Sequence, residues 1–472
     1  MDCNRVIHVE VALLTSCRAQ LNVLKSVIKK WLRIQRLFTN GCCVFGRDTS
    51  NAVLADNIVK LVVNCDDILI GESIVIDDSS AIAVHLYQLF NDPPNCEQLS
   101  DDEGGLSQSD TDVSAGTTWL LPHTEFDDAW DMLYFDSDIK RQVVRYVSAM
   151  LQLSNAGVHP NIITMNRLVL FHGPPGTGKT TLAKAIAQKL SIRLASAVPS
   201  GTEVADGSGV TEDICTPMSH PFMYGQLVEI NSHSLFSKWF SESGKLVQKL
   251  FAKIRAMLEE RTTIVFVLVD EVESLTVARQ TALAGNEPSD AVRVVNALLT
   301  QLDAIRRFPN VLVITTSNLS ESVDPAFLDR ADIKLKIEIP SPLAIYEIYR
   351  SCLLELDRCG IVSSAANHLR AAKHVQDNGS DVTPVSVQLF NVAQRSVGLS
   401  GRTLRKLPVL ALANHTIAQG NTKIPLSDFI SALWKAAENC IHNTNEAQNK
   451  VGQNRLEGPV SPATSFGILP MG

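Results

Sequence analysis

The sequence predicts an α/β fold in which a parallel sheet has helices on both faces. Between about residues 160 and 340, strand-like runs alternate with helix-like segments; the runs are LVLFHG, QLVEINS, TIVFVLVDE, NVLVITTSN and IKLKIEIP. The first four are apolar nearly throughout, as strands are when helices cover both faces of a parallel sheet. The last run alternates with Lys334, Lys336 and Glu338, which favours a strand at the sheet edge. A glycine-rich loop after the first run is the third observation.

This loop fits the pattern G-x-x-x-x-G-K-[ST], which follows a strand and opens a helix. Its backbone N–H groups point at one spot, and the helix N-terminus adds about half a positive charge there, so a phosphate group fits. We expect the loop to bind a nucleotide, with Lys179 reaching its outer phosphates and the Thr180 hydroxyl holding Mg²⁺. A plain turn before a helix is the alternative. The expected nucleotide-binding residues are Gly173, Pro174, Pro175, Gly176, Thr177, Gly178, Lys179, Thr180 and Thr181.

Further polar residues close two of the other predicted strands. Asp270 and Glu271 end TIVFVLVDE, and Asn318 ends NVLVITTSN. Because ligands bind at the carboxyl ends of parallel strands, we expect these side chains beside the glycine loop. Asp270 is expected to take Mg²⁺ directly or through water, Glu271 to polarise the attacking water, and Asn318 to orient that water or contact the γ-phosphate. An acidic helix cap and an ordinary turn asparagine are the alternatives.

Phosphoryl transfer also requires cations near the γ-phosphate, and two arginines are candidates. Arg330 in DPAFLDRADIK precedes the last strand, where it could act across a subunit boundary. Arg402 in GLSGRTLRKL starts a helix of the C-terminal part, where it could fold back over the nucleotide. A surface salt bridge is the alternative for each.

The remaining chain is expected to form modules around this α/β domain. Alternating runs near the N-terminus predict a small α+β module, and the amphipathic segment from Asn22 predicts a helix that docks on a sheet or faces a partner. The stretch from Glu97 to Asp138 is rich in acidic residues and contains no Lys or Arg, and its first part favours a flexible linker. The expected organisation is an N-terminal α+β domain for substrate or adaptor binding over 1–96, an acidic linker over 97–118, the α/β domain over 119–340 with an insertion at 195–223, a helical lid domain over 341–443 and a disordered tail over 444–472.

Composition is that of an ordinary globular protein. The 472 residues are 45% hydrophobic and 19% charged, and the formal net charge of -8 argues against a dominant nucleic-acid surface. The 10 cysteines include no C-x-x-C pair. With no secretory leader or membrane span expected, this pattern favours a reducing compartment, free thiols and no structural zinc.

Taken in order, the phosphate loop, the Asp-Glu pair, the asparagine, Arg330 and the GLSGR helix resemble an AAA+ ATPase. Longer stretches resemble the pachytene checkpoint protein 2 family (thyroid receptor-interacting protein 13); they are YGQLVEINSHSLFSKWFSESGKLVQKLF, VDEVESLTVARQ, NEPSDAVRVVNALLTQLD and DRADIKLKI. The resemblance covers roughly residues 119–440 and extends weakly into the N-terminal module. The segments at 195–223 and 361–384 are longer than the family pattern, and the first forty residues resemble it poorly, so no N-terminal partner surface is carried over.

The resemblance implies a homohexameric ring that uses ATP and Mg²⁺ to unfold or convert HORMA-domain proteins, with a HORMA-type adaptor. It implies roles in meiotic chromosome-axis control and the spindle checkpoint, residence in nucleus and cytoplasm, and no direct contact with nucleic acid or membrane. By the family pattern, Thr180 and Asp270 would hold Mg²⁺, and Glu271 would activate water. The sensor would be Asn318, the trans-acting arginine Arg330 and the lid arginine Arg402. The substrate-gripping pore loop would contain Trp239 and Phe240, with a second pore loop near 285–290.

Two other functions are compatible with the nucleotide motifs. A nucleic-acid motor or clamp loader on the same fold would need a basic channel, whereas the adjacent Trp239 and Phe240 suit apolar gripping of a polypeptide. A nucleotide-dependent scaffold without turnover would need no hydrolytic residues, and the presence of Asp270, Glu271 and Arg330 argues against it.

Overall fold

The computed structural model describes residues 6–41, 43–44, 51–65, 68, 72–98, 114–159, 162–194, 222–231, 243–274, 290–318, 325–363, 368–372, 375, 383–415 and 423–456. The chain divides into two compact units, Met1–Glu338 and Ile339–Gly472. Each unit has its own elements and its own core.

A seven-stranded sheet organises the first unit, in the order β12-β8-β11-β10-β9-β7-β6. Its parallel strands are β8 (Leu168–His172), β9 (Tyr224–Asn231), β10 (Thr263–Asp270), β11 (Val311–Ser317) and β12 (Ile333–Lys336). They are the five strands predicted from the sequence, and β12 is the predicted edge strand. Two further strands, β7 (Ser114–Leu121) and β6 (Asn95–Gln98), extend the sheet beyond β9 in antiparallel pairing.

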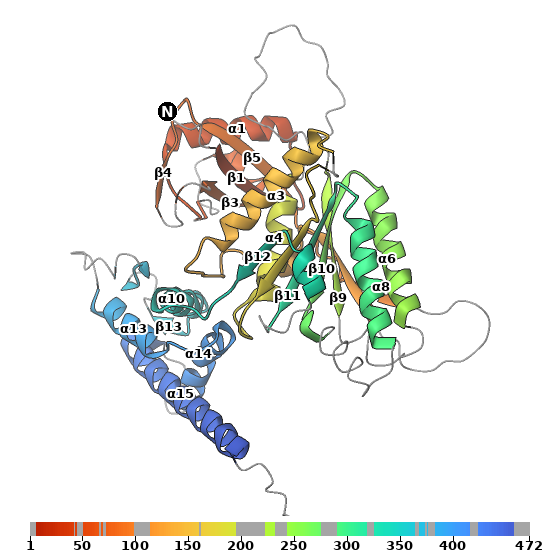
Figure 1. Ribbon diagram of the computed structural model, residues 1–472. Coiled ribbons are helices and arrows are strands. Elements are labelled where there is room, and N and C mark those ends of the chain that lie inside the picture. The colour runs from red at the N-terminus through yellow and green to blue at the C-terminus, as the bar shows by residue number, and fades with distance from the viewer. Residues whose placement is uncertain are drawn as a thin grey trace, which may run out of the picture. The chain divides into compact units, whose positions relative to one another are not determined.

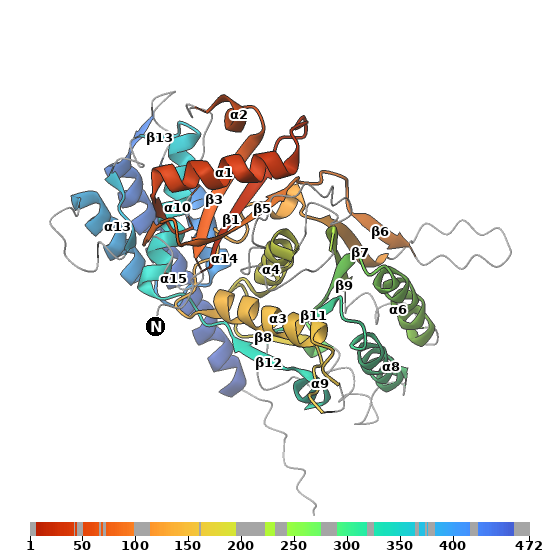
Figure 2. The same cartoon turned by 90° about the horizontal axis from the view of Figure 1, so that it is seen from above.

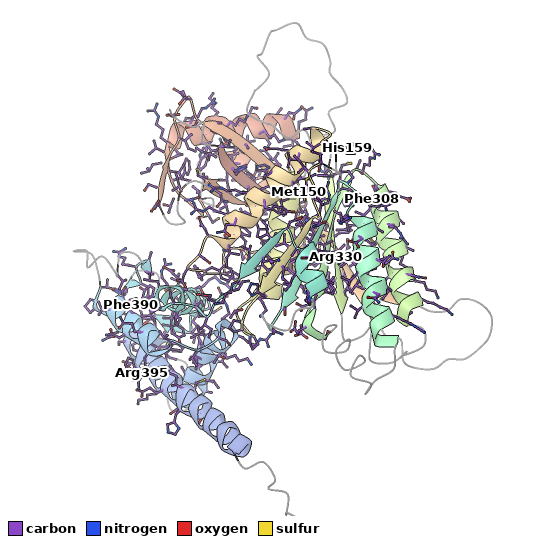
Figure 3. The ribbon with its side chains drawn as sticks, in the orientation of Figure 1. Met150, His159, Phe308, Arg330, Phe390 and Arg395 are labelled. Carbon is purple, nitrogen blue, oxygen red and sulfur yellow. The ribbon has the colours of Figure 1, made fainter. Side chains whose placement is uncertain are left out.

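Helices cover both faces of this sheet, as Figures 1 and 2 show. One face carries α3 (Ile139–Asn155) and α4 (Lys179–Leu194); the other carries α6 (Ser243–Glu259) and α8 (Asp290–Ile305). Alternate residues of each strand serve the two faces, so that Phe266 packs in the α3/α4 core and Val267 in the α6/α8 core. Met150 on α3, labelled in Figure 3, is buried in the first of these cores. The predicted α/β fold with a helix-covered parallel sheet is therefore confirmed.

The N-terminal domain is a small α+β module within the same unit. Its elements are β1 (Val6–Leu13), α1 (Leu21–Gln35), β2 (Leu37–Thr39), α2 (Ala52–Ala55), β3 (Ile58–Cys65), β4 (Ser73–Val75) and β5 (Ala81–Tyr87). In the three-stranded sheet β3-β1-β5, β1 runs antiparallel to β3 and parallel to β5. The amphipathic helix expected from Asn22 is α1, which buries Leu24, Ile28 and Leu32 in the core beneath it.

The structure corrects the expected acidic linker over 97–118. β6 and β7 are antiparallel neighbours in the central sheet, with Asn95 opposite Thr118 and Glu97 opposite Gly116. The acidic run therefore connects two strands of one sheet and does not separate two domains; residues 99–113 lie outside the described residues. Its charge indicated a solvated connection but carried no information on which elements it joins. The small and hydroxylated residues that open β7 lack the apolar alternation by which a strand is recognised.

Between the sheet and α3 lies the short 3-10 helix η1 (Thr124–Phe126), and α9 (Pro325–Arg330) leads into β12. Trp119 and Phe126 are buried in the α3/α4 core and contact each other edge to face, with ring centroids 5.6 Å apart. The entry segment into the α/β domain is thus fixed by aromatic packing.

The second unit is mainly helical, as expected for the C-terminal part. It contains α10 (Pro342–Arg358), β13 (Val362–Ser363), α13 (Pro384–Arg395), α14 (Gly401–His415), β14 (Ile424–Pro425) and α15 (Leu426–Leu456). Tyr349 of α10 is fully buried and donates a hydrogen bond of 2.8 Å to Ser396 after α13.

The structure also corrects the expected tail over 444–472, because α15 continues to Leu456. Residues 444–456 mix strong helix formers with weak ones, among them Gly452 and three asparagines, and most of them are polar. Such a segment has no apolar stripe to signal a helix, so the sequence pattern did not distinguish it from a disordered tail. Residues 457–472 lie outside the described residues.

No helix in the described ranges combines the length and the apolar character needed to cross a membrane.

Candidate functional site

The glycine-rich loop joins β8 to α4 at the carboxyl end of the parallel strands. Gly173 has a φ of 147°, and a Cβ added there would lie 2.1 Å from the carbonyl oxygen of Ile337. Gly178 has a φ of 95°, and its added Cβ would lie 3.2 Å from Leu133. Any other residue would be strained at these positions, and at Gly173 it would also clash with backbone. The loop therefore has a fixed shape at a helix N-terminus, as a phosphate cradle requires.

Lys179, the first residue of α4, is buried with its ammonium group on the loop. Its Nζ donates to the carbonyl oxygens of Gly173 at 2.9 Å and Pro174 at 2.7 Å. The hydroxyl of Thr177 donates to the same Pro174 carbonyl at 2.9 Å. Because phosphate oxygens are charged and accept stronger hydrogen bonds than carbonyls, a nucleotide phosphate would compete well for this ammonium group.

Three side chains from three elements meet beside the loop. The Thr180 hydroxyl on α4 donates to the Asp270 carboxylate at the end of β10, with 2.9 Å to Oδ1 and 3.1 Å to Oδ2. Thr316 on the neighbouring strand β11 donates its hydroxyl hydrogen to the same carboxylate. We call Thr180, Asp270 and Thr316 the hydroxyl–carboxylate cluster. It brings together the two residues predicted to hold Mg²⁺.

Thr316 also fixes the backbone of the predicted water-activating residue. Glu271 has a φ of 56°, in the left-handed region that residues other than glycine seldom adopt. Its N–H group donates to the Thr316 hydroxyl at 3.1 Å, and the N–H of Val272 donates to the Thr316 carbonyl at 2.9 Å. Strained backbone of this kind persists only where its surroundings hold it. The turn that carries Glu271 is thus anchored to β11.

Asn318 and Glu273 form a second link between β11 and the segment after β10. The backbone N–H of Asn318 donates to Glu273 Oε1 at 3.0 Å, and Glu273 Oε2 is buried with no hydrogen-bond partner in the described part of the chain. The structure places the predicted sensor Asn318 directly after β11, the strand that carries Thr316.

Sequence reasoning missed Thr316 and Glu273. A signal for Thr316 existed: side chains two residues apart in a strand share a face, so a hydroxyl two positions before Asn318 falls on the side of the site. No comparable signal marked Glu273, whose partner lies 45 positions away.

His172 ends β8 directly before the loop. Burial lowers the pKa of His172, and the neighbouring cations Lys336 and Lys179 lower it further. Its carbonyl accepts the N–H of Ile337 at 2.8 Å, which ties the loop entry to the segment after β12. A neutral imidazole here adds no positive charge beside Lys179.

Arg330 occupies the last position of α9 and is labelled in Figure 3. Its guanidinium forms a two-pronged ion pair with Asp303 of α8, with Nε 3.1 Å from Oδ1 and Nη2 2.8 Å from Oδ2. Nη1 also donates to the carbonyl of Ala326 at 2.8 Å. These contacts hold the planar group in one orientation. The structure thus joins Arg330 to α8 through Asp303.

The other predicted residues are placed less fully. Arg402 is the second residue of α14 in the second unit, and its side chain is exposed. Trp239 and Phe240 lie outside the described residues, as do residues 285–289 of the expected second pore loop. The expected first pore loop lies in the sequence between β9, which ends at Asn231, and α6, which begins at Ser243.

The donor set suits a magnesium nucleotide. Mg²⁺ is held in nucleotide sites by one or two protein oxygens together with phosphate oxygens and water. Thr180 and Asp270 supply a hydroxyl and a carboxylate 2.9 Å apart beside the phosphate cradle. Within the described residues, no group of three or more His, Cys, Asp or Glu side chains could hold a metal by itself. The hydroxyl and carboxylate oxygens of Thr180 and Asp270, beside the phosphate cradle, fit a metal that binds together with its nucleotide.

Two family models match most of the chain after residue 168. The model described as "ATPase family associated with various cellular activities (AAA)" matches residues 169–339, which contain the loop and the cluster. The model described as "TRIP13-like, AAA+ ATPase lid C-terminal domain" matches residues 341–441, which contain Arg402.

Individual proteins match over nearly the whole chain. Pachytene checkpoint protein 2 homolog from Xenopus tropicalis is 42% identical over 412 residues, covering 86% of this chain and 88% of that protein. The homolog from Homo sapiens is 42% identical over 414 residues, covering 86% and 88%. The solved structure of C. elegans PCH-2 has a TM-score of 0.71 and 33% sequence identity, and it covers 93% of this chain and 100% of that one. These findings confirm the resemblance drawn from the motifs.

Proposed function

Because the chain belongs to the pachytene checkpoint protein 2 family of AAA+ ATPases, we propose that it is a hexameric, ATP-driven remodeller of HORMA-domain proteins. ATP hydrolysis is the activity common to proteins with this ATPase domain. The family resemblance adds three expectations to ATP hydrolysis: a HORMA-domain client, a HORMA-type adaptor and assembly into a ring.

The observation that carries the proposal is the hydroxyl–carboxylate cluster beside the loop. A protein that only holds a nucleotide needs a phosphate cradle but no group to activate water. Here Glu271 follows Asp270 directly. The Thr316 hydroxyl accepts the backbone N–H of Glu271 and donates to the carboxylate of Asp270. This arrangement supports turnover, and it speaks against a scaffold that is locked by nucleotide.

Each residue has a proposed role in hydrolysis. Thr180 and Asp270 are the proposed oxygen donors to Mg²⁺, which when bound neutralises charge on the phosphate oxygens. The ammonium group of Lys179 would give up its hydrogen bonds to the loop carbonyls and donate to the outer phosphates. Glu271 accepts a proton from the attacking water, and Asn318 orients that water or contacts the γ-phosphate.

Arg330 is the proposed cation from the neighbouring subunit. Its ion pair with Asp303 on α8 fixes the guanidinium before any ring forms, so little side-chain freedom would be lost on contact with a phosphate. Such a trans-acting arginine makes hydrolysis depend on assembly. A lone subunit is therefore expected to be nearly inactive.

The cellular role follows the family resemblance. We place the protein in meiotic recombination and chromosome-axis control and in the spindle checkpoint, with residence in nucleus and cytoplasm. A nucleic-acid motor is the second candidate, and the formal net charge of -8 weighs against it because nucleic-acid sites are basic.

An ATPase assay with a purified HORMA-domain protein, with DNA and with neither tests the proposal. Stimulation by the HORMA protein, together with a change in that protein's fold that requires hydrolysis, is the expected result. Glu271→Gln is the matched control, because it should bind the client without converting it. Stimulation by DNA alone would favour the motor, and a protein that binds ATP without turnover would favour the scaffold.

A further inference from the structure

Helix α4, which begins with Lys179 and Thr180, is buried along nearly its whole length. Toward the nucleotide end, Leu182 and Ile186 pack in the α3/α4 core. Toward the other end, Ile192 packs against Ala12 and Tyr87 of the N-terminal domain. Figure 2 shows α4 between the central sheet and the N-terminal domain. The helix of the phosphate loop thus has the N-terminal domain as part of its packing environment.

A buried ion triad joins the two domains at this helix. Glu10 Oε2 on β1 lies 2.5 Å from Lys189 Nζ, and Glu10 Oε1 lies 3.0 Å from Arg193 Nε. The three side chains are 6%, 6% and 8% exposed. Burial would raise the pKa of Glu10, but the two cations outweigh it and lower that pKa to about 2. Glu10 is therefore charged at neutral pH, and its buried carboxylate needs Lys189 and Arg193 in place.

Two further sets of contacts involve the segment that leads into the α/β domain, one with α4 and one with the N-terminal domain. Gln188 of α4 exchanges two hydrogen bonds with the backbone of His123, one of 2.9 Å from the His123 N–H and one of 3.0 Å to its carbonyl. Lys60 on β3 forms ion pairs with Asp127 and Asp128, which follow η1. The N-terminal domain therefore contacts α4 and the segment that leads into the α/β domain.

We propose that Glu10 is a positioning residue for ATP hydrolysis, which holds α4 through Lys189 and Arg193 and so couples N-terminal domain docking to nucleotide binding. Lys179 and Lys189 are ten positions apart on one continuous helix, about 15 Å at 1.5 Å per residue. A shift of the loop on binding phosphate is transmitted along such a rod. The triad resists a shift because a buried charge that loses its partner is left uncompensated. By linkage, if docking strengthens nucleotide binding by some factor, nucleotide binding strengthens docking by the same factor.

The test compares Glu10→Gln with the control Asp78→Asn, which removes an exposed carboxylate of the same domain. ATP hydrolysis gives KM and kcat, and hydrogen exchange of β1 and β5 with and without Mg²⁺-ADP reports docking. We expect Glu10→Gln to raise KM for ATP by about 2- to 30-fold, with a smaller change in kcat. We also expect Mg²⁺-ADP to protect β1 and β5 of the parent protein from exchange, and Glu10→Gln to abolish that protection.

A triple variant separates positioning from folding. Glu10→Leu with Lys189→Met and Arg193→Met replaces the triad by apolar groups of similar size, which is often neutral for stability. It should dock again and recover the KM of the parent protein. The inference is overturned if Glu10→Gln matches Asp78→Asn in both readouts, or if the triple variant docks but keeps the raised KM. No client protein is needed, so failure here leaves the proposed HORMA activity standing.

Discussion

The Thr180 hydroxyl and the Asp270 carboxylate lie 2.9 Å apart, which joins the first turn of α4 to the end of β10. Thr316 contacts the same carboxylate from β11, so three elements converge on one charged group. Because Thr316 also accepts the N–H of Glu271, it links the expected metal ligand to the expected water-activating residue. The first prediction concerns this threonine.

Thr316→Val should lower kcat by roughly tenfold or more and change ATP affinity less. The substitution removes the donor to Asp270 and takes the Thr316 hydroxyl away from the half-buried N–H of Glu271. Loss of such a partner costs up to about 1–3 kcal/mol. Thr315→Val is the matched control, since Thr315 is equally buried but its hydroxyl lies 3.4 Å from the Val169 carbonyl. Steady-state kinetics give kcat and KM for both variants, and thermal melts show whether either variant has lost stability. Equal kinetics for the two variants would remove Thr316 from the catalytic arrangement.

Glu271→Gln should bind ATP like the parent protein while hydrolysis falls by about 10²–10⁴, the usual contribution of one general base. The phosphate cradle and the hydroxyl–carboxylate cluster are unchanged in this variant. Lys179→Ala is the contrasting control, because it should weaken binding itself. Titration with a fluorescent nucleotide and phosphate release separate the two effects. Hydrolysis at the parent rate would show that another group activates the water.

The glycine loop, Asp270 and Asn318 could be predicted to lie together because their positions follow from local pattern and one topological rule. Strand ends are recognisable from apolar runs, and parallel strands present their carboxyl ends at one edge. The contacts that hold these residues could not be predicted in the same way. Thr316 is 46 positions from Asp270, and its pairing depends on the order in which β10 and β11 lie in the sheet.

Contacts between residues of different domains were still harder to predict from the sequence. Glu10 and Lys189 are 179 positions apart, and neither residue carries a motif. Their pairing is decided by how the N-terminal domain packs on α4, which no periodicity records. The connection between β6 and β7 shows the same limit, because the acidic composition of residues 97–118 indicated a solvated segment but not the two strands that it joins.

Arg330 should act in the site of the neighbouring subunit. A trans-acting arginine is worth about 10³–10⁵ in analogous phosphoryl transfers, so Arg330→Ala should be nearly inactive alone. Mixing Arg330→Ala subunits with Glu271→Gln subunits creates interfaces where an intact Glu271 meets an intact Arg330. Partial recovery of hydrolysis in mixed rings is expected. Mixed rings that assemble, as shown by light scattering, yet stay as inactive as either parent would contradict a trans role.

The triad predicts an acid-sensitive domain contact. Lys189 and Arg193 offset burial and depress the pKa of Glu10 from 4.5 to about 2. A carboxyl group whose pKa is lower in the folded state than in the unfolded state stabilises the folded state. This stabilisation is complete above the unfolded-state pKa and is lost as the pH falls through the folded-state pKa, here between about pH 4.5 and 2. The parent protein should therefore lose more unfolding free energy over that interval than Glu10→Gln. Denaturant titrations at several pH values measure the free energy of unfolding of both proteins. If it falls equally with pH in the two proteins, Glu10 does not stabilise the domain contact through its charge.

The adjacent aromatic residues Trp239 and Phe240 decide between a remodeller and an ordinary ATPase. Serines surround the pair in LFSKWFSES, in the connection between β9 and α6. Two large aromatic side chains in a polar loop are costly to leave in water unless they hold something. Burial of one such side chain is worth roughly 1.5–3 kcal/mol and requires no particular sequence in the partner. Loops of this kind around a ring axis could pull on almost any extended polypeptide.

Trp239→Ala should therefore leave basal ATPase and ring assembly nearly intact while it abolishes conversion of a HORMA-domain substrate. Basal hydrolysis depends on the glycine-rich phosphate loop and the hydroxyl–carboxylate cluster, and the substitution touches neither. Pulling on a substrate polypeptide depends on the apolar contact that Trp239 provides. Substrate conversion, basal ATPase and the melting temperature are measured on the same preparation. If melting temperature and ATPase fall together, Trp239 belongs to the domain core. If the variant converts the substrate at the parent rate, gripping resides in another loop.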